Sequence, residues 1–501
     1  MSSSPYLSQE LKDYMKQNNI EETLSKIVNQ LLRGKYSDPY AFMMNEFGKL
    51  AKNDITILSV VPYQVLNLNS LPSIKLQYTI EYKQKEYKIE TSFQFGQASE
   101  TVVPLYDNVN EVDSGKGVLN ALELIKNKIN PILNKKSARD QKQIDEQLVQ
   151  LYEANEKKGI NAIQTISYSL NQVIAQIEKI QPYEVIRQLS GFEGEFQNPK
   201  IMVNLLQGSK LVGVKCKIYK FLLIVEKYEN GKQLLDIVSQ ITGNIKKTIT
   251  SGKLGEAALK YHTDGTFIVT VDSINDNMKM IEEAINKTPY KDNVYVGLNL
   301  MADNLYLPDK KLYELENPKQ LMDPVQLADF LLKLCTDKPI IKYIQDPIKN
   351  DDLEGWSKFM AKFQGKNIQI ASSFLYSTIN KIKETSLESD KDSNPQMSEN
   401  EINAANAKKF DLHCAHYRPF EYPTLSSFLE VAKMSINKKN STAVIIQENL
   451  EEFTDTTIVD LAFGLKNCWL NLVSPFKLER LLKYNRIIEI LELEKIKHDS
   501  N

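Results

Sequence analysis

The residues most able to do chemistry are scattered along the chain, and one short cluster stands out. His413, Cys414 and His416 lie within four positions of one another and could supply imidazole and thiolate ligands to a metal ion. A metal site needs three or four ligands in fixed geometry, and the surrounding sequence offers no fourth partner. The pattern therefore favours a packed strand or an exposed loop over a metal centre. The charged run at 349–352 (KNDD) is likewise typical of a solvated loop.

Two glycine-containing segments resemble phosphate-binding loops only in composition. SGKG begins at Ser114 and SGKLGE begins at Ser251, and neither has the spacing of a Walker motif. Both indicate ordinary turns or helix starts. The cysteines form no CxxC pair, which is typical of buried thiols in a reducing compartment. They are Cys216, Cys335, Cys414 and Cys468.

The composition is that of an ordinary globular chain. The 501 residues are 42% hydrophobic and 25% charged, and the formal net charge is −2. This balance gives no overall field to hold nucleic acid or an anionic membrane. No apolar run approaches the ~20 residues of a membrane helix, and no basic segment followed by an apolar stretch opens the chain. We expect a cytoplasmic protein of about three domains, or a large barrel with additions.

The first fifty residues predict two short amphipathic helices. The first helix carries apolar residues at helical spacing and ends at Gly34. The second begins with Asp38 as its N-cap and Pro39 at its first position. Two such helices bury too little surface to be stable alone, so we expect them to dimerise, or to dock on a partner or on their own main domain. The residues assigned to this docking module are Leu24, Ile27, Val28, Leu31, Asp38, Pro39, Tyr40 and Met44.

The rest of the chain predicts two further units. Alternating apolar residues over 74–82 and 87–95 predict an antiparallel hairpin with its turn at 83–86. Apolar residues at helical spacing then predict helices at 116–134, 139–154 and 159–178. From about residue 200, short apolar runs alternate with helical segments, which favours a parallel sheet, most simply a closed β/α barrel. The polar segment 385–408 predicts a surface insertion. The apolar runs are 202–206, 267–271, 294–300, 340–344, 368–371, 443–446 and 469–473.

Six segments, in order, resemble the enolase family. They are SGKGVLNALELI (114–125), DQKQIDEQL (140–148), GINAIQTISYSL (159–170), YIQDPIKNDDLEGW (343–356), FTDTTIVDLAFGL (453–465) and LERLLKYNRIIEI (478–490). The resemblance implies an α/β chain with an α+β cap domain at 53–190 and an eight-stranded, TIM-like β/α barrel at 191–492. The helical module then occupies 1–52, and a tail follows at 493–501. The family also implies a homodimer.

The segment IEETLSKIVNQLLRGKYSDPYAFM (20–43), with its Asp38-Pro39-Tyr40 signature, is similar to the Dpy-30/RIIα-type dimerisation-docking domain. In that family two copies form an antiparallel four-helix bundle that presents a groove to an amphipathic helix. Enolase-like chains with such an extension resemble the enolase-4 type. That resemblance implies a location in motile cilia and sperm flagella, and a partner helix from an axonemal protein.

The enolase resemblance implies a metal site whose ligands are missing. Enolase chemistry removes a proton next to a carboxylate and uses a strong base with one or two Mg²⁺ ions. The family's three metal carboxylates correspond to Asn299, Gln345 and Ser372. Asn and Gln are neutral near-isosteres of Asp and Glu, so the site can keep its shape while it loses its charge. Asp346 follows Gln345 in the expected strand and is predicted to face the opposite side.

The positions that move protons in the family are also altered. Its base lysine corresponds to Arg418, which cannot deprotonate, although His413 and His416 could act as bases nearby. Lys220 stands at the position of the acid carboxylate, and Asp264 remains as a shortened carboxylate. The other family positions are occupied by Leu211 (loop histidine), Glu448 and Asn449 (phosphate clamp), Asn471 (last-strand lysine) and Ser99 (retained lid serine).

Together these changes indicate loss of the mechanism rather than a new substrate, because removing any one such group costs orders of magnitude in rate. We therefore predict a catalytically degenerate enolase-like protein that needs no cofactor and serves as a scaffold of the ciliary axoneme. One alternative is an active Mg²⁺-dependent enolase that converts 2-phosphoglycerate to phosphoenolpyruvate in the cilium. Another is an anion sensor that uses Lys220 without turnover.

Overall fold

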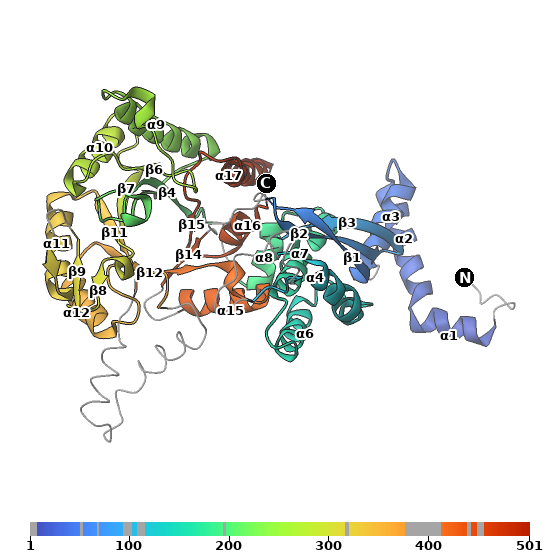
Figure 1. Ribbon diagram of the computed structural model, residues 1–501. Helices are drawn as coiled ribbons and strands as arrows, with labels where there is room; N and C mark the ends of the chain where they lie inside the picture. Colours follow the sequence, from blue (N-terminus) through green and yellow to red (C-terminus); the bar gives the residue numbers. More distant parts are fainter. Residues whose placement is uncertain are drawn as a thin grey trace, which may run out of the picture.

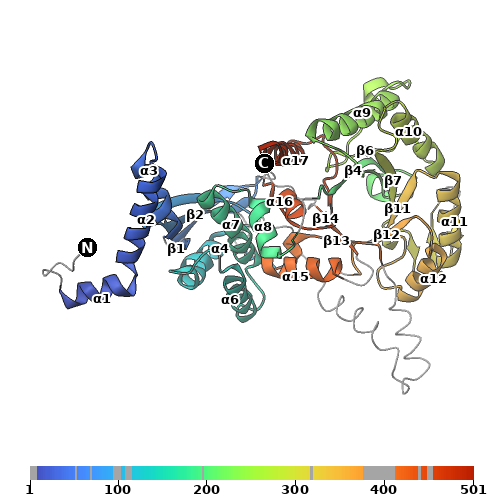
Figure 2. The ribbon, with the colours of Figure 1, turned by 180° about the vertical axis from the view of Figure 1, so that it is seen from behind.

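The computed structural model describes residues 8–50, 54–67, 70–93, 103–107, 116–193, 197–315, 320–375, 412–437, 442–447 and 455–500. Three units follow one another along the chain: the N-terminal helices, an α+β cap domain and a β/α barrel (Figure 1). Opposite views place the barrel and the cap domain side by side, with the N-terminal helices beyond the cap domain (Figure 2). The expected insertion at 385–408 lies outside the described residues.

The N-terminal module contains three helices where two were predicted. They are α1 (Gln9–Gln17), α2 (Ile20–Gly34) and α3 (Pro39–Leu50). Helix α1 was not predicted because it is short and mostly polar, with only Leu11, Tyr14 and Met15 as apolar residues at helical spacing. The predicted start of α3 is confirmed, since the Asp38 carboxylate accepts a hydrogen bond from the Ala41 N–H at 2.9 Å.

The cap domain places helices against a three-stranded antiparallel sheet. Strands β1 (Thr56–Leu66), β2 (Pro72–Tyr82) and β3 (Lys85–Thr91) pair in sequence order. The predicted hairpin is confirmed, with a two-residue turn at Lys83 and Gln84, both of positive φ, as a type I′ turn requires. The helices are α4 (Leu119–Leu124), α5 (Asn130–Leu133), α6 (Gln141–Ala154), α7 (Ile160–Glu178) and α8 (Pro182–Ser190), with a π-helical turn at Ile125–Ile129.

Eight strands close into a barrel because β15 pairs with β4. The closed barrel is confirmed, but the expectation of an entirely parallel sheet is wrong, since β5 runs antiparallel to both of its neighbours. Only a short 3-10 turn (Lys210–Val212) and no α-helix separates β4 from β5, so this pair departs from the alternation of strand and helix on which the prediction depended. The strands are β4 (Lys200–Gln207), β5 (Lys220–Val225), β7 (Val294–Asn299), β11 (Ile341–Gln345), β12 (Gln369–Ser372), β13 (Cys414–Tyr417), β14 (Ala443–Gln447) and β15 (Cys468–Asn471).

Two barrel strands, β5 and β13, were absent from the predicted apolar runs, and one run lies elsewhere. The run at 267–271 forms β6 (Phe267–Ile268), which pairs with the end of β4 outside the closed ring. Small strands β8 (Tyr306–Leu307), β9 (Leu312–Glu314) and β10 (Leu321–Met322) form a separate sheet. The segment that begins at Ser251 is the end of a helix and a turn, as predicted. The segment at Ser114 begins outside the described residues.

Helices surround the barrel and cover its outer face (Figures 1 and 2). The expected tail at 493–501 instead continues the last helix as far as Ser500. Among the described residues, none of the helices is both long and apolar enough to cross a membrane. The barrel helices are α9 (Gly231–Thr250), α10 (Ile274–Asn286), α11 (Pro324–Asp337), α12 (Leu353–Phe363), α15 (Leu425–Ile436), α16 (Thr457–Gly464) and α17 (Leu478–Ser500).

The lower interior of the barrel is apolar and filled with large side chains. Tyr343 and Trp469 meet there with ring centroids 5.7 Å apart, and Met202, Leu222 and Ile224 complete the layer with other small and aliphatic residues. A closed barrel of eight strands leaves just enough interior for such side chains, so this layer is a packed floor rather than a pore. Water therefore cannot reach the polar groups at the barrel mouth through this layer.

Helix α7 connects the cap domain to the loop that follows β13. It is buried along most of its length. The Gln164 amide donates to the backbone carbonyls of Phe420 and Tyr422, and the Tyr168 hydroxyl donates to the carbonyl of Pro419. These contacts fix the course of the chain just beyond Arg418, one of the predicted site residues.

A buried carboxylate on α6 adds a further clamp to the same loop. Asp145 accepts hydrogen bonds from the Ser167 hydroxyl at 2.6 Å and from the Ser426 N–H at 2.9 Å. Ser426 lies in the first turn of α15, so a cap-domain side chain satisfies a free N–H group at the start of a barrel helix. The two domains are thereby joined by polar contacts as well as by apolar packing.

Candidate functional site

The mouth of the barrel is lined by neutral amides. Of the eight barrel strands that the structure describes, five end in Asn or Gln, and parallel strands bring their carboxyl ends to one edge. Tyr295 lies in the interior layer, so Asn299, four positions further along β7, faces the same way. We call this set the carboxamide ring. Its members are Gln207, Asn299, Gln345, Gln447 and Asn471.

Two of the three predicted metal-ligand positions lie at this mouth. Asn299 and Gln345 are partners in the register between β7 and β11, and both are buried. The Asn299 side-chain carbonyl accepts a hydrogen bond from the Met301 N–H at 2.9 Å. The Gln345 amide donates to the Ser373 hydroxyl at 2.9 Å. The hydrogen bonds of both amides are thus directed within the protein.

The third predicted position, Ser372, is the last residue of β12, and its neighbour Ser373 makes the contact with Gln345. Ala371 lies in the interior layer, so Ser372 points away from it and Ser373 returns to the inner side. The Ser372 hydroxyl accepts hydrogen bonds from the N–H groups of Phe374 and Leu375, and it is Ser373 that meets Gln345. Ser372 is therefore directed to backbone groups of the following turn, whereas Ser373 lies beside Gln345.

Asp346 also differs from expectation, because its carboxylate does not face away from Gln345. Its φ of 48° places it in the left-handed region just past the end of β11, where strand alternation no longer applies. The carboxylate accepts hydrogen bonds from the Ser373 N–H and hydroxyl, both at 2.7 Å, and from the Gln345 amide at 3.3 Å. Burial raises the pKa of Asp346, which the bonds from Ser373 oppose.

Lys220 and Asp264, two of the predicted site residues, form a buried ion pair. Lys220 lies at the mouth end of β5 and Asp264 on the loop before β6, and their charged atoms are 2.7 Å apart. His262 and the Thr266 N–H also contact the Asp264 carboxylate. Burial alone would raise the pKa of Asp264, but the charge of Lys220 and these hydrogen bonds hold it well below its usual range. The pair is therefore internally neutralised.

His416 points into the barrel and cannot accept a proton near neutral pH. Its Nε2 lies 2.6 Å from the Tyr343 hydroxyl, and its Nδ1 lies 3.0 Å from the Gln447 side-chain oxygen. Burial lowers the pKa of His416 to about 3, and the charge of Arg418 adds to this effect. His413 lies before β13, at the opposite end of the strand, and is exposed. The two imidazoles therefore do not converge on one site.

The remaining predicted positions lie around the mouth or outside the described residues. Arg418 pairs with Glu421 at 2.9 Å, and Leu211 is largely exposed on the loop between β4 and β5. The Asn471 side-chain carbonyl accepts a hydrogen bond from the Val473 N–H at 3.2 Å. Ser99, Glu448 and Asn449 lie outside the described residues.

This set of groups does not suit Mg²⁺. Magnesium requires hard, anionic oxygen ligands, whereas Asn299, Gln345 and Ser373 offer neutral oxygens. Asp346 is the nearby carboxylate, and both of its oxygens accept hydrogen bonds from protein donors. Over the part of the chain that the structure describes, three or more His, Cys, Asp or Glu side chains nowhere gather closely enough to hold a metal ion.

Sequence reasoning missed two members of the mouth, Gln207 and Ser373. Gln207 is the register partner of Lys220, so it faces the same side of the sheet, and neither polar atom of its buried amide has a hydrogen-bond partner. The sequence did contain a signal for Gln207, because the expected strands that end at Asn299 and Gln345 also close with an amide residue. It could be used only once the strand ends were known to meet.

Comparison with known protein families agrees with this arrangement. The profile of "Enolase, N-terminal domain" matches residues 57–186, and that of "Enolase, C-terminal TIM barrel domain" matches residues 195–404. The two matches together span about two thirds of the chain. The chain belongs to the enolase family. Residues 8–50, which form the N-terminal helices, lie outside both matches.

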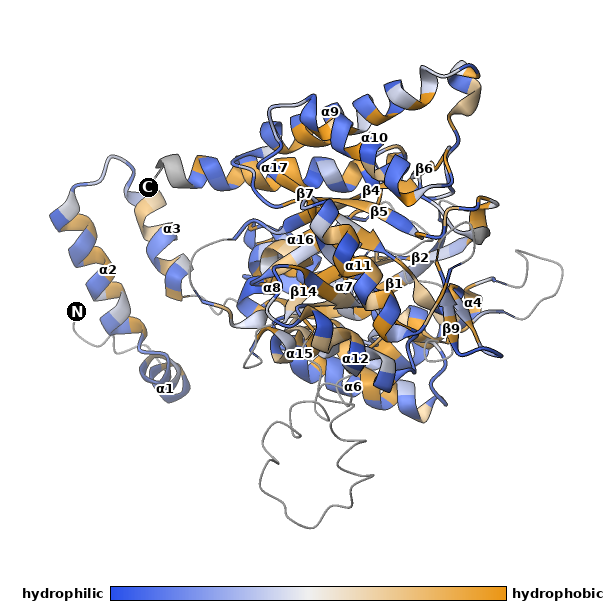
Figure 3. Cartoon of the chain, turned by 90° about the vertical axis from the view of Figure 1, so that its left-hand side faces the viewer, coloured by the Kyte–Doolittle hydropathy of each residue, from blue (hydrophilic) through white to orange (hydrophobic). Residues whose placement is uncertain are grey.

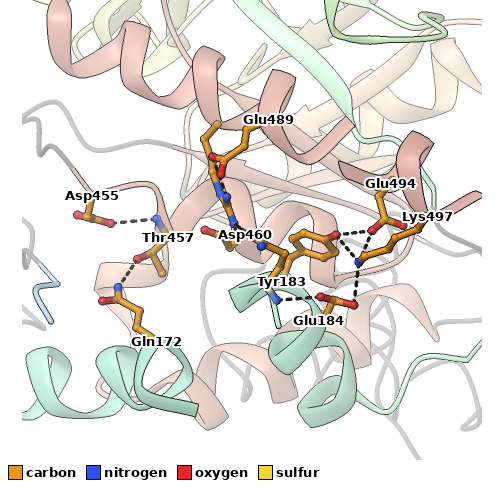
Figure 4. Close-up of polar contacts among 11 residues, drawn as sticks. Gln172, Tyr183, Glu184, Asp455, Thr457, Asp460, Glu489, Glu494 and Lys497 are labelled. Carbon is orange, nitrogen blue, oxygen red and sulfur yellow. Dashed lines mark hydrogen bonds and ion pairs between the residues drawn. The ribbon is translucent and has the colours of Figure 1, made fainter. Parts of the chain in front are cut away.

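In this enolase-family fold a second polar cluster lies between the cap domain and the outer barrel helices (Figure 4). Asp460 on α16 is buried and pairs with Arg486 on α17 at 2.7 Å. Arg486 also donates to the Gln181 side chain at 3.0 Å and pairs with Glu489 at 2.9 Å. Burial raises the pKa of Asp460 to about 6, although Arg486 acts to lower it.

The same interface continues to the end of α17. The Lys497 ammonium pairs with Glu184 at 2.9 Å and with Glu494 at 2.8 Å, and the Tyr183 hydroxyl donates to Glu494 (Figure 4). Tyr183 and Glu184 belong to α8 of the cap domain. These contacts give a structural role to residues that the sequence had suggested were a tail.

We predict that Lys220→Met lowers the free energy of unfolding by about 3–5 kcal/mol, because it removes the lysine that balances the charge of the buried Asp264 carboxylate. The double variant Lys220→Met/Asp264→Asn should recover most of the loss, since it removes the charge and keeps the acceptor for the Thr266 N–H. Urea denaturation measures both. Lys49→Met, in the exposed pair with Glu46, is the matched control and should change little. Equal stability of Lys220→Met and wild type would contradict a buried charge pair.

A second prediction concerns pH. Because the folded pKa of Asp460 is about 6 and its ordinary value is 3.8, the folded state holds this proton more tightly than the unfolded state between those values. Asp460 therefore adds stability as the pH falls from 7 to 4, roughly 2–3 kcal/mol in total. Relative to Asp460→Asn, the wild-type free energy of unfolding should rise by that amount over this range. Parallel stability profiles for the two proteins would refute the shift.

Proposed function

We propose that this chain is a non-catalytic member of the enolase family that serves as a scaffold in the ciliary axoneme. The carboxamide ring supports the first part most directly. At the strand ends where the family resemblance expects metal carboxylates, the chain presents neutral amides and a serine. The acid positions hold the Lys220–Asp264 pair, whose charges cancel.

Several independent catalytic requirements fail at once under this proposal. Proton abstraction needs a base with a pKa near the working pH, whereas Arg418 stays charged and His416 is buried and neutral. Stabilisation of the intermediate needs divalent cations, for which the ligands are unsuitable. The role of an anion sensor is also poorly supported, since the charge of Lys220 is already balanced by Asp264.

The N-terminal helices support the docking role. Ile27 is buried within the module and Leu31 is partly covered. Leu24, Val28 and Leu32 are exposed at a spacing of four, which puts them in one stripe along α2 (Figure 3). Tyr40 and Met44 on α3 are also exposed, while Asp38 and Pro39 serve as the helix start. An exposed apolar stripe of this kind is typical of a surface that binds another helix.

The proposed partners are a second copy of the chain and an amphipathic helix of an axonemal protein. The ciliary location follows from the combination of a docking extension with an enolase body. It is a proposal about where the scaffold acts, and it is separable from the question of catalysis.

Enolase activity tests the first part. Purified full-length protein with 2-phosphoglycerate and Mg²⁺ should form no phosphoenolpyruvate above the blank. The formation of phosphoenolpyruvate is measured by its ultraviolet absorbance. Added Mg²⁺ should also leave the melting temperature unchanged, because no anionic site awaits the ion. Turnover that disappears on chelation would establish the alternative, an active Mg²⁺-dependent enolase in the cilium.

Co-sedimentation with detergent-extracted axonemes tests the second part. The wild type should pellet with axonemes, and Leu24→Glu/Val28→Glu should weaken this binding by roughly 100-fold, since charges replace two exposed apolar side chains that docking would bury. Asn29→Glu/Gln30→Glu adds the same charges at exposed polar positions of α2 and should bind as the wild type does. Equal pelleting of both variants, or no pelleting of the wild type, would remove the docking proposal.

A further inference from the structure

The carboxamide ring presents open hydrogen-bond donors at the barrel mouth. The side-chain carbonyl of Asn299 accepts from the Met301 N–H at 2.9 Å, and that of Asn471 accepts from the Val473 N–H at 3.2 Å. The side-chain nitrogens of these two amides have no partner among the residues that the structure describes. They are not enclosed, because the two residues keep 8% and 6% of their surface exposed and neither nitrogen is among the fully buried atoms without a partner. A ligand at the mouth can therefore accept hydrogen bonds from both amides.

These donors face the axis of one closed barrel. Trp469 belongs to the interior layer, so Asn471, two positions further along β15, faces inward as Asn299 does. Gln447 ends the neighbouring strand β14 and adds a third donor nitrogen, since its side-chain oxygen lies 3.0 Å from Nδ1 of His416. A barrel of eight strands is so narrow that inward side chains from its different strands lie close together. The three donors can therefore act on one ligand.

The charged groups of the mouth favour an uncharged ligand, because they are already balanced within the protein. Lys220 and Asp264 are 2.7 Å apart, Arg418 lies 2.9 Å from Glu421, and the Asp346 carboxylate is held by hydrogen bonds. An ion of either sign entering the mouth would lose hydration without gaining a free counter-charge. The open groups are neutral amide donors, which match neutral oxygen acceptors.

Two exposed aromatic rings lie at the rim of the same mouth. Tyr261 is 43% exposed and Phe476 is 39% exposed, and their ring centroids are 5.9 Å apart. Phe476 lies against Gly265, the residue after Asp264, which places the rings beside the Lys220–Asp264 pair. Aromatic side chains with a few well-placed polar groups are typical of small-molecule sites. The C–H face of a sugar ring or a polyol packs on such a ring while its hydroxyl oxygens accept hydrogen bonds.

We propose that the barrel mouth binds an uncharged polyhydroxylated molecule, of the class of monosaccharides and polyols. Its hydroxyl oxygens accept hydrogen bonds from the open nitrogens of Asn299, Asn471 and Gln447. Its carbon skeleton packs against Tyr261 and Phe476. This binding is independent of the scaffold role, since it involves neither the N-terminal helices nor a catalytic step.

Saturation-transfer NMR of the full-length protein with D-glucose, myo-inositol and sorbitol tests the proposal. We expect saturable binding of at least one of the three. Asn299→Asp and Asn471→Asp each keep the oxygen that accepts the backbone N–H and replace only the donor nitrogen, so each should weaken binding by about tenfold. Tyr261→Ala changes an exposed side chain, so the protein should stay folded while its affinity falls severalfold.

The matched control makes the same chemical change at the opposite end of the barrel. The Asn230 side-chain carbonyl accepts from the Gln233 N–H at 2.9 Å at the start of α9, beyond the end of β5 that pairs with the first residue of β7. Asn230→Asp should leave the affinity within about twofold of wild type. Three outcomes would overturn the proposal. These are no saturable signal with any of the three compounds, an equal loss from Asn230→Asp and Asn299→Asp, or tighter binding of inorganic phosphate than of all three.

Discussion

Closure of the barrel is the constraint on which the rest of this molecule depends. The pairing of β15 with β4 brings strand ends from residue 207 to residue 471 to a single mouth. Beneath that mouth the interior is filled by Tyr343, Trp469 and their neighbours, so no water reaches the polar groups from below. Any charge placed at the strand ends must therefore be balanced by its immediate neighbours, since solvent cannot screen it.

The groups at the mouth follow this rule in three different ways. Lys220 is paired with Asp264, and the Asp346 carboxylate is held by the hydroxyl and N–H of Ser373. Asn299 and Gln345 carry no charge and direct their hydrogen bonds to protein groups. A magnesium-dependent site works in the opposite way, because it keeps several carboxylates together and lets the ion balance them. This contrast is the physical reason for the proposed loss of catalysis.

The cap domain fixes one loop at the barrel mouth, and it also carries polar groups that are buried elsewhere. Helix α7 fixes the loop beyond Arg418 through Gln164 and Tyr168. Further along the same helix, the side chain of Asn171 is buried and has no hydrogen-bond partner. The side-chain oxygen of Gln164 and both polar atoms of Asn171 are buried without a hydrogen-bond partner, so the pairing is incomplete on both stretches of α7.

The sequence by itself determined the enolase resemblance and the fold class, and it predicted that neutral residues stand at the family's charged site positions. Those features depend on residue type and on local periodicity, as the hairpin around Lys83 and the cap at Asp38 illustrate. Only the tertiary structure decided that Ser373 rather than Ser372 meets Gln345, that Asp346 turns back toward it, and that Gln207 joins the ring. Each of these depends on register between strands far apart in the chain. A change of one residue reverses which face a strand side chain occupies, and local sequence does not carry that information.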